Sequence, residues 1–212
     1  MRNTEEVAMS LKSKLGQAVV PALLLASIAV PALAHPGHPG GEPAAVGFAG
    51  GFAHPFGGFD HLMAMIAVGL WAVQQSAKQP RALWLLPASF VAAMAGGFVL
   101  ALTGVALPGV ETGIALSVLL LGLIVAFAVR PPLPAAMAVT ALFALFHGHA
   151  HGTEVGDASQ AAVYALGMLL ATALLHGLGL TAARLAQRFS LGLVTRFAGA
   201  AVALAGVVIL VG

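Results

Sequence analysis

Six apolar segments separated by short loops constrain this chain more than any other feature. Each is close to the roughly 20 residues that a helix needs to cross the hydrocarbon core of a bilayer. Prolines mark joins at Pro80, Pro108 and Pro131, where helices end readily. We therefore predict an all-α integral membrane protein, a six-transmembrane-helix bundle. Its spans are residues 54–74, 82–102, 113–129, 133–151, 160–183 and 194–211.

The composition agrees with a membrane location. Hydrophobic residues make up 60% of the 212 and charged residues 8%, whereas soluble domains have about 25% charged residues. Small residues four apart allow helices to pack closely in lipid, as in Ala93/Gly97, Gly113/Ser117 and Gly199/Ala203. The absence of cysteine excludes disulfides, iron–sulfur clusters and thiolate metal sites. We expect the lipid bilayer as a partner and no nucleic acid, and the oligomeric state stays open.

The N-terminal segment has the features of a secretory signal peptide. Basic residues precede an apolar stretch from Ala18, and Ala32-Leu33-Ala34 is typical of a cleavage site just before His35. An uncleaved first membrane helix is the alternative. With cleavage, the chain divides into a signal peptide (1–34), a periplasmic tail (35–53) and a transmembrane domain (54–212).

The loop charges predict the orientation. The basic residues after the signal lie in or beside alternate loops: Lys78, Arg81, Arg130, Arg184, Arg188 and Arg196. The other loops hold only the acids Glu42, Glu111, Glu154 and Asp157. By the positive-inside rule the basic loops are cytoplasmic. Both mature termini then lie outside a bacterial cytoplasmic membrane, which agrees with signal cleavage.

Two motifs place titratable side chains at the outer ends of the first and fourth predicted spans. They are "HPFGGFDH" (54–61) and "FHGHAHGTE" (146–154). An ionisable residue within a span costs about 2.5–3.5 kcal/mol on insertion scales and marks a functional candidate. The candidate metal ligands are His54, Asp60, His61, His147, His151 and Glu154.

The spacing within each motif bears on chelation. His147 and His151 share a helix face, and Glu154 follows one turn later. On a straight helix, His54 and His61 would lie about 10 Å apart along the axis, too far for one ion. We expect Gly57-Gly58 to loosen the backbone and let them converge. Imidazole with carboxylate suits Ni, Co, Zn or Cu(II). The nearby methionines Met63 and Met65 are more typical of packing.

Four further histidines are candidates for auxiliary roles. His149 lies off the face shared by His147 and His151. His176, in the fifth span, is either an inner relay or a hydrogen-bonding partner of a neighbouring helix. His35 and His38 either chelate metal in the tail or have no role in capture.

At these motifs the chain resembles the HupE/UreJ family of nickel permeases. The family patterns H-P-x-x-G-x-D-H and F-H-G-x-[AV]-H-G-x-E are both met in full. The resemblance implies secondary uptake of Ni(II) linked to hydrogenase or urease maturation. It also implies that the motif His, Asp and Glu residues bind the ion. No permanently bound cofactor is expected, and Co(II) is an alternative substrate.

Other functions are less compatible with the sequence. A G-x-x-x-x-G-K-[ST] motif is absent, so transport must be driven by a gradient, the membrane potential or a partner. A membrane-embedded zinc hydrolase is an alternative, but H-E-x-x-H is absent and we expect no enzyme. A b-type haem would need histidines deep in facing helices. Retinal would need a lysine within a span, and Lys78 lies in a loop.

Overall fold

The computed structural model describes residues 47–155 and 158–212, and every element in them is helical. Five helices, α4 to α8, are long and apolar enough to cross a membrane, and the bent pair α2 and α3 adds a sixth candidate. The prediction of an all-helical membrane protein is therefore confirmed. The predicted signal peptide, His35 and His38 lie outside the described residues. The elements are α2 (Gly47–Gly57), α3 (Phe59–Ser76), α4 (Ala82–Leu102), α5 (Val110–Phe127), α6 (Leu133–Glu154), η1 (Ala158–Gln160), α7 (Ala161–Arg188) and α8 (Gly192–Val211).

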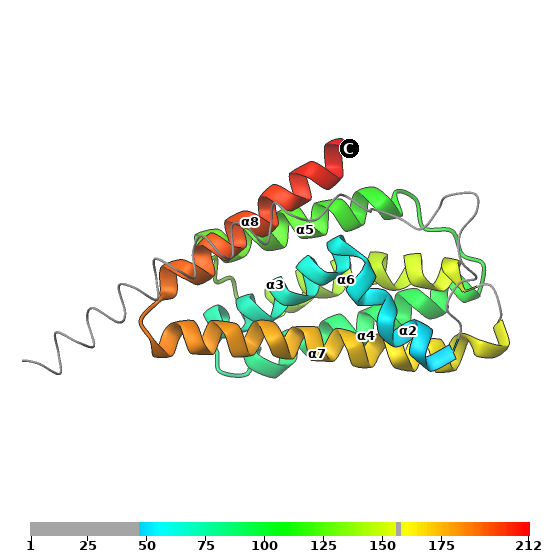
Figure 1. Ribbon diagram of the computed structural model, residues 1–212, viewed down its shortest axis with the longest axis horizontal. Helices are drawn as coiled ribbons and strands as arrows, with labels where there is room; N and C mark the ends of the chain where they lie inside the picture. The colour runs from blue at the N-terminus through cyan, green and yellow to red at the C-terminus, as the bar shows by residue number, and fades with distance from the viewer. Residues whose placement is uncertain (1–46, 156–157) are drawn as a thin grey trace, which may run out of the picture.

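The first predicted span is two helices rather than one. α2 and α3 meet at an angle of 81°, because Gly58 between them has an extended backbone (φ −90°, ψ 112°). α2 also begins at Gly47, within the segment predicted as a tail. Glycine-rich α2 is held by close packing on α7: a methyl group at Gly51 would overlap the carbonyl of Tyr164. Figure 1 shows α2 lying across α7.

Helix α3 lies at the centre of the bundle and contacts α2, α4, α5, α7 and α8. Its C-terminal end is tied to the end of α5 by side-chain hydrogen bonds. The indole Nε1 of Trp71 donates to the carbonyl of Val129 (2.9 Å), and Nε2 of Gln74 donates to that of Val125 (3.0 Å). These bonds satisfy polar groups that would otherwise be unpaired in an apolar interior.

Close contacts between small residues join the other helices. A methyl group at Gly97 in α4 would overlap the Leu145 carbonyl of α6, and one at Gly148 would overlap the Met94 carbonyl in return. α5 and α8 meet in the same way, at Gly199 (Figure 1). Small residues at positions predicted from sequence therefore lie at the helix interfaces, where they let the backbones approach.

The two ends of the bundle carry different charges. The connections from α3 to α4, from α5 to α6 and from α7 to α8 carry or adjoin the basic residues. Arg196, near the start of α8, donates from Nε to the carbonyl of Ala126 at the end of α5 (2.7 Å). Glu111 lies in the first turn of α5 and Glu154 ends α6, so both lie at the opposite end. Large apolar side chains are exposed around the bundle, as lipid contact requires: Trp84, Leu142, Leu166, Leu178, Phe197 and Leu204.

Candidate metal centre

Four imidazole rings from three helices gather at the acidic end of the bundle. The centroid of the His61 ring lies 4.5 Å from that of His147 and 4.4 Å from that of His151. His54 lies 4.7 Å from His151 and 6.4 Å from His61, centroid to centroid. The break at Gly58 therefore brings His54 and His61 together, and both meet the second motif. Polar side chains that are distant in sequence form one cluster.

Glu154 closes this cluster on its exposed side. Its Oε2 atom lies 3.2 Å from Nε2 of His54 and 3.6 Å from Nδ1 of His151. These three residues each offer a ligand atom within 4.8 Å of the others. The Glu154 side chain is 42% exposed and that of His54 26%, whereas that of His151 is fully buried. The cluster thus runs from the exposed side chain of Glu154 into the protein interior.

Asp60 holds the His61 ring in place. Its Oδ1 accepts a hydrogen bond from the backbone N–H of His61 (2.7 Å) and lies 2.8 Å from Nδ1 of the same residue. An ionised carboxylate only accepts hydrogen bonds, so Nδ1 of His61 carries the proton. Nε2 then presents its lone pair. A carboxylate that orients an imidazole in this way is common beside protein-bound metals.

Several ring nitrogens in the cluster are buried and have no hydrogen-bond partner among the described residues. They are Nε2 of His61, Nδ1 of His147 and both nitrogens of His151. Leaving one such group unsatisfied costs about 1–3 kcal/mol. Each neutral imidazole has one bare nitrogen, so a cation that accepted one lone pair from each ring would reduce this cost. With Glu154, this donor set suits Ni, Co, Zn or Cu(II).

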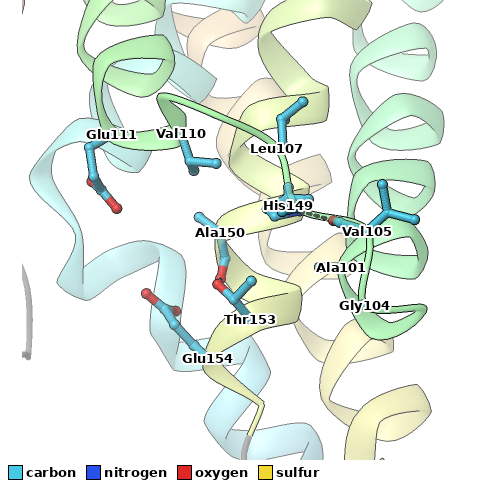
Figure 2. A pocket seen from close by; sticks show the side chains of 11 residues that line it. Ala101, Gly104, Val105, Leu107, Val110, Glu111, His149, Ala150, Thr153 and Glu154 are labelled. Atoms are coloured by element: carbon cyan, nitrogen blue, oxygen red, sulfur yellow. Dashed lines mark hydrogen bonds between the residues drawn. The ribbon is translucent and has the colours of Figure 1, made fainter.

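His149 faces a different part of the structure. Its Nε2 donates to the carbonyl of Val105 in the loop after α4 (2.8 Å) (Figure 2). The ring lines a cavity of about 380 Å³ together with Glu111, Thr153 and Glu154. Glu154 is shared by this cavity and the histidine cluster. His149 therefore belongs to the wall of this cavity rather than to the cluster.

His176 lies apart from the four clustered rings, next to Phe90. The Phe90 ring centroid lies 5.8 Å from that of His147 and 5.0 Å from that of His176. His176 is 1% exposed, and both its ring nitrogens lack a partner among the described residues. The predicted alternative of a hydrogen bond to a neighbouring helix is absent from the described part of the chain.

Sequence reasoning missed three neighbours of the cluster. Oγ of Ser117 lies 2.8 Å from Nε2 of His147, and the Tyr164 ring centroid lies 6.1 Å from that of His54. Phe90 is the third. Tyr164 and Phe90 belong to no recognisable motif. The spacing of Ser117 from Gly113 indicated helix packing and not a contact with a histidine.

The chain resembles known proteins over most of its length. The profile of the HupE / UreJ protein family matches residues 23–209. The chain is 50% identical over 188 residues to "Protein HupE" of Rhizobium leguminosarum bv. viciae, covering 89% of this chain and 95% of that protein. No solved structure matches the chain. With most of its length covered by the profile and by this relative, the chain belongs to the HupE/UreJ family.

Proposed function

We propose that this chain is a secondary transporter that imports Ni(II) across the bacterial cytoplasmic membrane for hydrogenase or urease maturation. The observation that carries the proposal is the cluster of four imidazoles and Glu154, which unites two separate motifs at one end of a membrane bundle. Membership of the HupE/UreJ family supports it. Co(II) accepts the same donors and is the alternative substrate.

In this proposal the acidic end of the bundle faces outward. Lys78, Arg81 and Arg130 lie at the other end, which is cytoplasmic by the positive-inside rule. The cavity lined by His149 and Glu154 is then the outer mouth of the pathway. A carboxylate at this mouth attracts divalent cations and disfavours anions.

The ion is captured stepwise. Glu154 and His54 are the most exposed members of the cluster, so they replace the first waters of a hydrated ion. His61, His147 and His151 are buried, and they complete its coordination. A divalent charge in a low-dielectric interior is prohibitively costly unless it is compensated. Glu154 supplies one negative charge as a ligand. Asp60 supplies another while it orients His61.

We further propose that His176 is an inner station on the path. Its two ring nitrogens are buried without a partner among the described residues, and Phe90 lies close to both its ring and that of His147. In this proposal an ion that leaves the cluster passes along the Phe90 ring to reach His176. A single imidazole binds weakly, which suits a site that must release the ion inward.

Metal uptake into vesicles tests this function. Purified protein is reconstituted in liposomes, and uptake of Ni, Co, Zn and Cu(II) is compared with and without a proton gradient. Protein-free liposomes and a His61→Ala protein are the controls. We expect saturable Ni(II) uptake, or Co(II) uptake under the alternative, that is lost with His61→Ala. Uptake no faster than in protein-free liposomes under every gradient would contradict the proposal.

A further inference from the structure

Ser117 makes two short contacts that together fix the position of its hydroxyl proton. Oγ lies 2.6 Å from the carbonyl oxygen of Ile114, one turn earlier in α5. It also lies 2.8 Å from Nε2 of His147 in α6. Ser117 is fully buried, so water does not compete for either contact. A carbonyl oxygen cannot donate, and therefore the hydroxyl proton goes to Ile114.

The remaining contact then determines the tautomer of His147. A serine hydroxyl has one proton and accepts through its lone pairs. With its proton given to Ile114, Ser117 only accepts from His147, so Nε2 of His147 carries hydrogen. In a neutral imidazole the other nitrogen is then bare. That nitrogen, Nδ1, is buried and has no partner among the described residues.

The bare nitrogen belongs to the ring that meets His61. The two rings lie 4.5 Å apart, centroid to centroid, and almost perpendicular (89°). An imidazole that holds a metal commonly donates its other N–H to a fixed acceptor, which sets its tautomer and orientation. Asp60 is such an acceptor for His61. Ser117 is the corresponding acceptor for the Nε2–H of His147.

We propose that Ser117 is a positioning residue of the metal site, which fixes His147 as the Nε2–H tautomer and so makes Nδ1 its ligand atom. The identity of the ion in this inference rests on the proposed function. The tautomer of His147 does not depend on that function. In the metal-free protein the tautomer depends only on the contact between Ser117 in α5 and His147 in α6. The two claims can therefore fail separately.

Solid-state NMR of metal-free protein in lipid bilayers tests the tautomer. The histidines are labelled with ¹⁵N and ¹³C, and a His147→Ala sample identifies the His147 signals by difference. We expect a protonated Nε2 and a bare Nδ1 in the unaltered protein. In Ser117→Ala we expect the Nδ1–H form to appear. A protonated Nδ1 in the unaltered protein, or an unchanged tautomer in Ser117→Ala, would overturn the inference.

Metal titration of the same proteins tests the consequence. Loss of such a supporting partner typically weakens metal affinity about 10- to 100-fold, and we expect a loss of this size for Ser117→Ala. Ser117→Thr keeps a hydroxyl and should recover most of the affinity. Ser89→Ala is the matched control, because Ser89 also donates to the carbonyl three residues earlier (2.9 Å) but has no hydrogen bond with a histidine among the described residues.

The outcomes separate the two proposals. Equal Ni(II) affinity of Ser117→Ala and the unaltered protein would overturn the positioning role and leave the transport proposal intact. Absence of Ni(II) and Co(II) binding to the unaltered protein, with the expected tautomer, would overturn the transport proposal and leave the tautomer assignment intact.

Discussion

Nε2 of His54 and Oε2 of Glu154 lie 3.2 Å apart, although α2 and α6 hold them at distant points of the chain. His54 is the first residue of the motif at 54–61, and Glu154 is the last residue of the motif at 146–154. Their contact exists because α2 turns by 81° away from α3 at Gly58. His54 can thereby reach α6 while His61 remains in α3.

The carboxylate in this contact is predicted to be essential for uptake. Glu154→Gln keeps the shape of the side chain and removes its charge, so the ion loses both a strong ligand and charge compensation. We expect Ni(II) uptake into vesicles to fall at least about tenfold, since a single charge-assisted bond contributes about 1.5–3 kcal/mol. Asp157→Asn, which removes an acid from the same predicted outer loop, should leave uptake unchanged. Equal losses in the two variants would point to surface charge rather than ligation.

Close packing of α4 on α6 is predicted to support the cluster. Gly97→Ala places a methyl group against the Leu145 carbonyl, and such overpacking typically destabilises by about 1–3 kcal/mol. We expect a lower Tm in detergent. Gly96→Ala is the matched control, because outside its own stretch of helix no atom of the described residues lies within 4 Å of the position of its methyl group. A Tm for Gly97→Ala equal to or above that of Gly96→Ala would show that α4 and α6 do not meet as described.

The orientation can be tested cleanly because the chain contains no cysteine. Ala106 and Lys78 are exposed and lie in connections at opposite ends of the bundle. We expect a membrane-impermeant maleimide to label Ala106→Cys in spheroplasts. Lys78→Cys should react only after the membrane is opened. The reverse pattern would place the histidine cluster on the cytoplasmic side.

If His176 is an inner station, its loss should slow transport without weakening metal binding at the cluster. His176→Leu replaces the buried imidazole with an apolar side chain that needs no partner. We expect the Ni(II) affinity of the outer cluster to be unchanged in a titration, and the maximal uptake rate in vesicles to fall severalfold. Unchanged uptake would mean that His176 is not on the path. A drop in affinity would mean that the change disturbs the cluster itself through Phe90.

The apolar pattern predicted most of the fold. The span predicted at 82–102 matches α4, and that at 133–151 begins with α6 and ends three residues short of it. These helices are long and apolar over most of their length, so hydropathy defines them. The glycine-rich helix α2 was not predicted, because glycine disfavours an isolated helix. Its stability comes from packing on α7, through contacts such as that of Gly167 with Phe48, which no local pattern reveals.

The sequence predicted which histidines and acids lie together, but not how their side chains contact one another. Helix periodicity placed His147 and His151 on one face, and topology placed both motifs at one membrane depth. Sequence could not show that Asp60 contacts His61 through Nδ1, or that Ser117 contacts His147. Those relations depend on side-chain orientations across helices that are brought together only by tertiary packing.

The central claim is that the two motifs form one metal site. Calorimetric Ni(II) titration of four proteins tests it most directly: the unaltered chain, His61→Ala, His151→Ala and the double variant. We expect one ion per chain in the unaltered protein, a loss of affinity of at least about 100-fold in each single variant, and little further loss in the double variant, because contacting residues are not additive. Two independent ions, each still bound after loss of the other motif, would contradict the claim.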